Sequence, residues 1–190
     1  MAKISNREKV VVTGMGVVSC LGCSVKEFWD NLIKGISGIK TISLVSPEPF
    51  SCKVAGEIRN FNPGDRINKR ESRRMARFTQ YAVYAAEEAF IDSGIDVDKE
   101  NMDRVGVLLG VGSGGLPETD EQAEIKSARG VMRMSPYYIP MMLPNMASAN
   151  LSRIWGITGY TNTCITACAA STQAIGEAAE IIRHGKADVV

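Results

Sequence analysis

Residues 161–171 read TNTCITACAAS, and this short stretch determines how the rest of the sequence is interpreted. The β-branched run 161–166 predicts a strand, and the small residues that follow open a helical pattern over 169–184. Cys168 therefore falls where a strand turns directly into a helix. Unpaired N–H groups and the positive end of the helix dipole at such a corner lower the pKa of a thiol and favour its reactive thiolate form. One of those N–H groups can also act as an oxyanion donor.

The same residues also fit a structural role. Free cysteines are often small, buried members of a protein core, so spacing alone does not separate a nucleophilic Cys168 from a buried one. The small neighbours of Cys168 leave an approach to its sulfur open, as in the nucleophile elbow of hydrolases. Cys164, inside the apolar part of the predicted strand, is expected to belong to the core.

Composition and charge are those of an ordinary soluble globular protein. The chain has 190 residues, 45% hydrophobic and 23% charged, with a mean hydropathy of −0.03. A net charge of +1 gives no argument for nucleic acid or a membrane surface as partner. No apolar run approaches the ~20 residues of a membrane span, and the polar start MAKISNREKV lacks the core of a secretory signal. We therefore expect a cytoplasmic protein.

The sequence offers little for a metal or a nucleotide. Cys20 and Cys23 form a C-x-x-C pair, but no second pair of ligands lies nearby, and the one histidine of the sequence, His184, is far along the chain. An odd number of cysteines, five, favours reduced thiols. The glycine-rich segments TGMGVVSCLG and GVGSGG lack the acid-ended strand that a dinucleotide site needs about 20 residues later. We therefore expect no cofactor, and glycines that let backbones or a substrate approach closely.

Strand and helix signals alternate along the chain and predict an α/β fold. Helix signals comprise a capping box at Ser24 and Glu27 and apolar periodicity over 71–93, 117–129, 145–155 and 169–184. Strand signals are KVVVTG at 9–14, RVGVLLGVG at 104–112, TNTCIT at 161–166 and ADVV at 187–190. Since the last of these stops within an apolar run, we expect residues 1–190 to be the N-terminal part of a larger domain.

The segment TACAAS, followed by TQAIGEA, resembles the active-site region of the β-ketoacyl-ACP synthases, above all the type II fatty-acid elongation enzymes. The similarity covers nearly the whole chain, because VVVTGMGVVSCLG, GVGSGGL, SPYYIPMMLPNMASA and GKADVV occur in the expected order and spacing. Gly159 stands nine residues before Cys168, as the family pattern requires. The sequence departs from that pattern at Cys164, where an aliphatic residue is usual.

This resemblance implies the N-terminal half of a thiolase-like fold, with a mixed sheet flanked by helices in αβαβα layers, and a homodimer. It implies acyl transfer from acyl carrier protein (ACP) to Cys168, followed by decarboxylative condensation with malonyl-ACP to give 3-oxoacyl-ACP. The pathway would be fatty-acid or polyketide elongation. Two histidines, a lysine and a second oxyanion donor would come from a C-terminal half. His184 cannot replace them within its helix, because it lies roughly 24 Å along the helix from Cys168.

The resemblance also assigns roles outside the corner. Ser113 takes a position beside the acyl pocket where type II enzymes often carry an isoleucine gate, and Tyr138 takes an aromatic position that reaches the partner's pocket. An interface packing role for Tyr138 is an open alternative. Arg70, Arg73, Arg74 and Arg77 recur at helical spacing, so they predict a basic face if one helix includes them all. The resemblance implies that the acidic carrier docks near this position, which favours docking over the alternative of a merely solvated face.

Two other functions remain open from the sequence. The first is a catalytically incomplete ketosynthase-like subunit that only dimerises or sets chain length; such subunits typically lack the cysteine, so Cys168 argues against it. The second is thiolase-type or starter-condensing chemistry on the same fold. The continuous match from TACAAS to AIGEA and the basic cluster favour the elongating branch.

Overall fold

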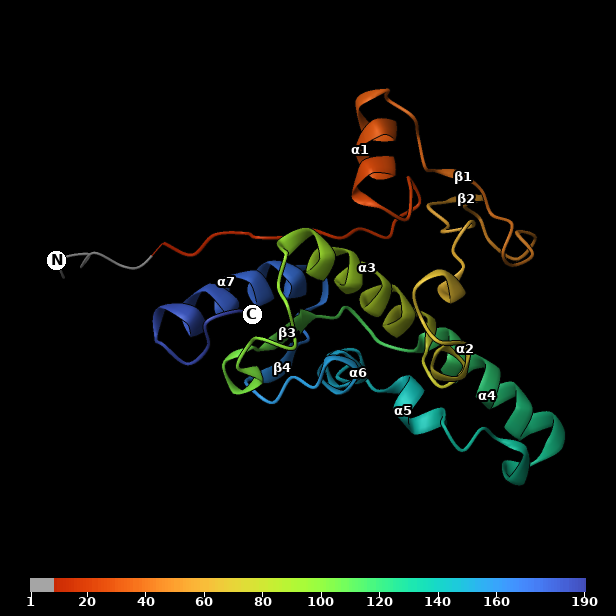
Figure 1. Cartoon of the computed structure of the whole chain (residues 1–190). Helices are drawn as coiled ribbons and strands as arrows, with labels where there is room; N and C mark the ends of the chain where they lie inside the picture. Colours follow the sequence, from red (N-terminus) through yellow and green to blue (C-terminus); the bar gives the residue numbers. More distant parts are fainter. Residues whose placement is uncertain (1–8) are drawn as a thin grey trace, which may run out of the picture.

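A computed structural model describes residues 9–190 and shows short strands alternating with longer helices (Figure 1). The helices are α1 (Val25–Ile33), α2 (Lys69–Ser72), α3 (Arg77–Ser93), α4 (Leu116–Arg129), α5 (Tyr138–Met142), α6 (Met146–Trp155) and α7 (Ala170–Arg183). The strands are β1 (Lys40–Thr41), β2 (Val54–Ala55), β3 (Val107–Gly110) and β4 (Thr161–Cys164). This arrangement confirms the predicted α/β class.

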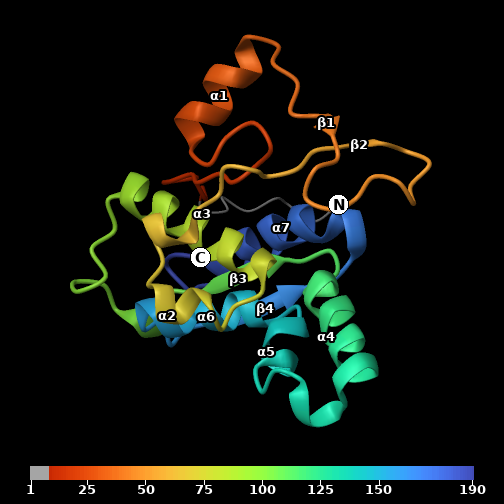
Figure 2. The same cartoon turned by 90° about the vertical axis from the view of Figure 1, so that its right-hand side faces the viewer.

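Two separate strand pairs make up the sheet structure of the described residues. β3 and β4 run parallel, with Val107 opposite Thr161 and Gly110 opposite Cys164. Before β3, Val105 forms a parallel bridge with Val189, and the Gly106 N–H donates to the Val189 carbonyl at 2.8 Å. β1 and β2 form an antiparallel pair. Together with α1, that pair projects away from the layers around β3 (Figures 1 and 2).

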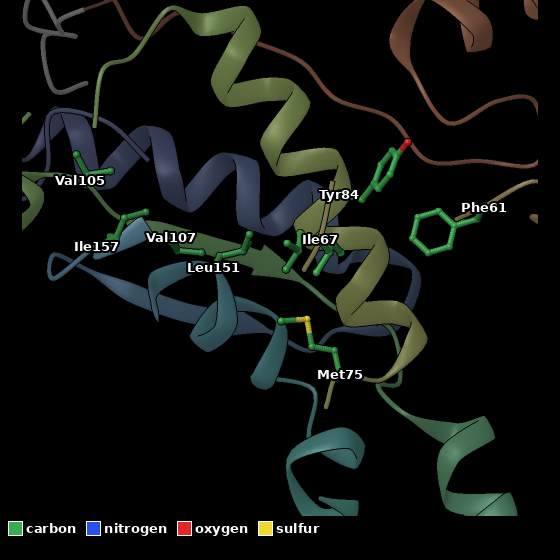
Figure 3. Close-up of a cluster of buried hydrophobic side chains, with 9 residues drawn as sticks. Phe61, Ile67, Met75, Tyr84, Val105, Val107, Leu151 and Ile157 are labelled. Carbon is green, nitrogen blue, oxygen red and sulfur yellow. The ribbon is translucent and has the colours of Figure 1, made fainter. Parts of the chain in front are cut away.

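β3 lies between helices on its two faces because its side chains alternate. Val105 and Val107 point into the core that β3 forms with α3 and α6, where they join Tyr84 and Leu151 (Figure 3). The opposite face meets α7, and Gly110 contacts the first turn of that helix. The core cluster comprises Phe61, Ile67, Met75, Val83, Tyr84, Val105, Val107, Leu151 and Ile157. The strand-to-helix corner at residues 164–170 is thus positioned by packing on both faces of the sheet.

Helix bounds follow the local signals closely. Ser24 Oγ caps α1 by accepting from the Glu27 N–H at 3.2 Å. The Glu27 carboxylate in turn accepts from the Cys23 N–H at 2.9 Å. In an ideal capping box it would accept from the N–H of the capping residue itself, one position later. α3 ends at Gly94 with φ 69°, the left-handed conformation that glycine adopts without strain. Within residues 9–190, no helix has the length and apolar character needed to cross a membrane.

The predicted strand at 9–14 is wrong for the described structure, because this segment is extended but has no strand partner (Figure 1). A hollow of about 490 Å³ separates it from β3 and α7. The side chains of Val11 and Val12 are 71% and 79% exposed as a result. Hydrogen bonds from the Met15 N–H to Asp92 and the Val17 N–H to Glu88 attach the following residues to α3 instead.

The single long helix predicted over 71–93 is also wrong, since the chain breaks between α2 and α3. Ala76 has φ −62° and ψ 158°, an extended conformation that interrupts the helical hydrogen bonds. The break turns Met75 and Ala76 into the core, where they are only 3% and 1% exposed. The Gln80 side chain donates to the Ser72 and Met75 carbonyls at 2.8 and 3.1 Å, so it satisfies acceptors that the break leaves open.

Candidate active site at the strand-to-helix corner

Cys168 lies on the turn that joins β4 to α7. A 3₁₀ turn, Ala167–Ala169, follows β4 after two residues and leads directly into α7. The side chain of Cys168 is exposed. Within the described range, the first turn of α7 carries no acidic side chain that would oppose the positive end of the helix dipole. The corner therefore presents a thiol to solvent beside the amide end of a 14-residue helix.

Ala167 shows how sharp this corner is. Its φ of 49° makes it the non-glycine residue with a positive φ in the described part of the chain. A residue with a Cβ rarely adopts this left-handed conformation, and it persists only where the surroundings enforce it. One such constraint is the Val111 N–H, which donates to the Cys164 carbonyl at 2.9 Å and ties the corner to the loop after β3.

The loop after β3 carries Ser113 alongside this corner. Ser113 is exposed in the turn that leads to α4. Gly115 of this loop is packed closely, since a Cβ there would lie 2.3 Å from the Met141 carbonyl oxygen of α5, whereas a Cβ on Gly112 would meet nothing within 4 Å. Tyr138, half-buried, is the first residue of α5. The loop that carries Ser113 therefore contacts α5, which begins with Tyr138, and its Val111 N–H bonds to Cys164 at the end of β4.

The predicted basic face does not form on one helix. Arg70 belongs to α2, Arg73 follows its last residue, and Arg77 is the first residue of α3. All are exposed, but Arg74 lies over the Tyr137 ring at 5.2 Å from its centroid. Arg77 is held by Tyr81 and by the Ile58 carbonyl at 3.1 Å. The four arginines all fall within residues 70–77, and we call them the arginine cluster, but the break between α2 and α3 gives them a spacing that is not that of a helix face.

Structural contacts account for three other side chains that could have carried chemistry, namely Cys164, Cys23 and His184. Cys164 is buried, as predicted, and burial raises the pKa of its thiol, followed by its hydrogen bond to Glu177. Burial likewise raises the pKa of Cys23, with Glu27 adding to it. His184 is exposed, and its Nδ1 lies 2.7 Å from the Glu180 carbonyl at the end of α7, a contact at the helix terminus. Among residues 9–190, no group of three His, Cys, Asp or Glu side chains is arranged to hold a metal ion.

Sequence reasoning missed the polar side chains behind the corner. Thr166, Gln173 and Glu177 form a hydrogen-bonded chain that reaches Cys164. The available signal was the spacing of Gln173 and Glu177, four residues apart, which places both on one face of α7. Only the tertiary structure shows that this face meets Cys164 and Thr166.

Comparison with known proteins agrees with this geometry. The sequence profile of the β-ketoacyl synthase N-terminal domain matches residues 7–190. The chain belongs to the β-ketoacyl synthase family. A 3-oxoacyl-[acyl-carrier-protein] synthase 2 of Staphylococcus aureus (strain COL) is 42% identical over 187 residues, which is 98% of this chain and 45% of the relative. A synthase 2 of Synechocystis sp. is 36% identical and covers 95% of this chain.

Solved ketosynthases share the fold of this β-ketoacyl synthase chain. The ishigamide ketosynthase/chain length factor superposes with a TM-score of 0.85 at 30% identity, covering 95% of this chain and 45% of that one. A type II polyketide ketosynthase, solved in complex with its acyl-carrier protein and bound to the hexaketide, gives a TM-score of 0.78 at 28% identity. These likenesses confirm the ketosynthase-type, thiolase-like fold. The chain spans slightly less than half the length of these relatives.

Proposed function

We propose that this chain carries the acyl-accepting half of a β-ketoacyl-ACP synthase, with Cys168 as nucleophile. The observation that carries the proposal is an exposed thiol directly after a strained residue, at the N-terminus of α7, in a member of the ketosynthase family. The Cys168 sulfur attacks the thioester carbonyl of acyl-ACP, a new thioester forms, and the thiol of the carrier leaves. Malonyl-ACP then loses CO₂, and its carbanion attacks the acyl-cysteine to give 3-oxoacyl-ACP and free Cys168.

We expect residues 9–190 to support acyl transfer but not the complete condensation. Decarboxylation and proton transfer need polar groups within hydrogen-bond reach of the reacting atoms. His184 lies at the far end of α7 from Cys168. The histidines and lysine of the mechanism are therefore expected in the remaining part of the relatives' length, which the C-terminal half of the ketosynthase would supply.

The test treats the two steps separately. The chain is incubated with acyl-ACP, and intact and peptide mass spectrometry then measures acylation, with Cys168→Ala as the disabled variant and Cys164→Ala as the matched control. We expect acylation at Cys168 that Cys168→Ala abolishes and Cys164→Ala retains. Release of CO₂ from malonyl-ACP is followed in parallel. Acylation distributed equally among the cysteines would contradict the proposal, and 3-oxoacyl-ACP formed by this chain alone would contradict its incompleteness.

ACP is the proposed partner at the arginine cluster, since a related ketosynthase was solved with its own acyl-carrier protein.

We also infer a homodimer. β4 pairs with β3 on one edge, and within residues 9–190 no strand covers the other. Ile165, beside that edge, is 55% exposed. An open edge of this kind is a template for pairing with a second copy. Sedimentation of the chain and of Ile165→Lys tests this, because a charge at the edge should shift a dimer toward monomer.

We propose a cytoplasmic location for the protein. Within the site, we propose that Ser113 and Tyr138 line the acyl pocket. The small, exposed Ser113 leaves room beside the corner, so Ser113→Ile should reduce acylation by long chains more than by short ones. An unchanged chain-length profile would remove the support for Ser113. The alternative function, a non-catalytic partner subunit, predicts instead that Cys168→Ala leaves every activity of the assembled enzyme intact.

A further inference from the structure

A continuous chain of side-chain hydrogen bonds lies behind the corner and joins the end of β4 to α7. The Thr166 hydroxyl donates to Gln173 Oε1 at 2.9 Å. Gln173 Nε2 then donates to Glu177 Oε1 at 2.6 Å, and the Cys164 thiol donates to Glu177 Oε2 at 3.5 Å. Both ends of the chain are therefore on the strand side, and its middle is on the helix.

Helix geometry explains part of why these four residues meet. Gln173 and Glu177 are four apart on α7 and therefore share a face. Cys164 is the last residue of β4, and Thr166 follows it by two residues at the corner. Each polar atom has a complementary partner: the amide oxygen of Gln173 accepts from a hydroxyl, and its N–H meets a carboxylate. Burial raises the pKa of Cys164, so its thiol keeps the proton that it donates to Glu177.

These hydrogen bonds reach the residue just before the strained Ala167, whose φ is 49°. Such backbone persists only where surrounding contacts over-determine it. The hydrogen bonds from Thr166 and Cys164 fix the chain just before Ala167, and the Ala170 N–H, which donates to the Ala167 carbonyl, fixes it just after. The backbone around Cys168 is thereby fixed at the start of α7.

We propose that Gln173 and Glu177 are positioning residues that hold the corner so that Cys168 faces the amide end of α7. This inference rests on the proposed role of Cys168 as nucleophile. Neither residue touches the reacting sulfur; each acts through Thr166 or Cys164. The reactivity of the Cys168 thiol, rather than the stability of the fold alone, is therefore the property that the two residues control.

The experiment measures the iodoacetamide alkylation rate of Cys168 relative to that of Cys52 in the same molecule by peptide mass spectrometry. Cys52 is exposed and lies in a different segment, so it is an internal reference. Gln173→Met and Thr166→Val remove links of the chain with little change in shape. Thr166→Ser restores the hydroxyl, and Thr172→Val, an exposed neighbour in the same turn of α7, is the matched control. Thermal unfolding of every variant is recorded alongside.

We expect the wild-type ratio to exceed one clearly, and Gln173→Met and Thr166→Val to lower it about fivefold, as for the loss of one hydrogen bond. Thr166→Ser and Thr172→Val should retain it. A high ratio in the wild type that Gln173→Met and Thr166→Val leave unchanged, even if their melting temperatures fall, would overturn the positioning role and leave the nucleophile in place. A wild-type ratio near one would overturn both.

Discussion

Gly110 at the end of β3 lies directly against Ala170 at the start of α7: a Cβ on this glycine would come within 2.2 Å of the Ala170 carbonyl carbon. The backbone of the strand therefore supports the first turn of the helix that follows Cys168. The contact joins backbone to backbone, so no side-chain rotation can relieve a clash there. Close approach between β3 and α7 is a direct consequence of glycine at this position.

Gly110→Ala is accordingly predicted to destabilise the fold by about 1–3 kcal/mol, since strand and helix must move apart. Gly176→Ala is the matched control within α7, because a Cβ there would meet nothing within 4 Å. It should stabilise the helix by up to about 1 kcal/mol. Urea unfolding followed by circular dichroism measures both. Equal effects of the two substitutions would contradict the close contact.

Replacing the buried residue Thr79 should stabilise the fold. Its side chain is 1% exposed, and its hydroxyl has no hydrogen-bond partner among the described residues. Thr79→Val keeps the shape and removes the unsatisfied group, so the free energy of unfolding should rise by about 1–2 kcal/mol. Val83, one turn later on α3 and equally buried, provides the reverse change. Val83→Thr should lower stability by a similar amount; a stable Val83→Thr protein would mean that this core accepts hydroxyls.

Glu57 makes part of the stability depend on pH. Its carboxylate accepts from the Leu44 N–H at 2.9 Å and the Ser43 N–H at 3.0 Å, and these bonds lower its pKa from 4.5 to about 2. A depressed pKa adds stability that is fully present above 4.5 and is lost as the pH falls toward 2. Glu57→Gln should therefore be less stable at neutral pH and decline less over that window. Urea midpoints across the window test this, with Glu48→Gln in the same segment as control.

The arginine cluster predicts salt-dependent binding of an acidic carrier. Arg73 is exposed just after α2, and Arg74 lies over Tyr137 nearby. Charge reversal at Arg73 or Arg74 should weaken ACP binding about threefold and flatten its dependence on salt. Fluorescence anisotropy with labelled ACP measures both quantities. Arg129→Glu, an exposed charge at the far end of α4, should change neither. Equal losses from all the variants would indicate a general charge effect instead of docking.

Much of the local structure was predictable because its signals lie within a few residues of the feature. Ser24 accepts the N–H of the residue three positions later, and Gly94 supplies the left-handed residue that ends α3. The corner at Cys168 follows from a β-branched run that meets small helix formers. Caps and turns of this kind are decided by the chain's own neighbours, so one sequence suffices to find them.

The wrong predictions share one cause, which is dependence on partners far along the chain. The residues 71–93 have helical spacing, yet burying Met75 and Ala76 against the core is incompatible with one continuous helix. The valines at 10–12 have strand character, yet a strand requires a neighbour to bond with, and a hollow lies where that neighbour would be. In the first case burial in the core outweighed the helical propensity. In the second case the segment has strand propensity but no neighbouring strand to pair with.

By itself, the sequence determined the alternation of strands and helices, the ketosynthase family and the placement of Cys168 between a strand and a helix. Only the tertiary structure decided that Thr166, Gln173, Glu177 and Cys164 form one chain behind that residue. It also decided that Gly110 presses on the first turn of α7. The physical reason is that periodicity assigns a side chain to a face of its own element, whereas contact depends on which two faces packing brings together.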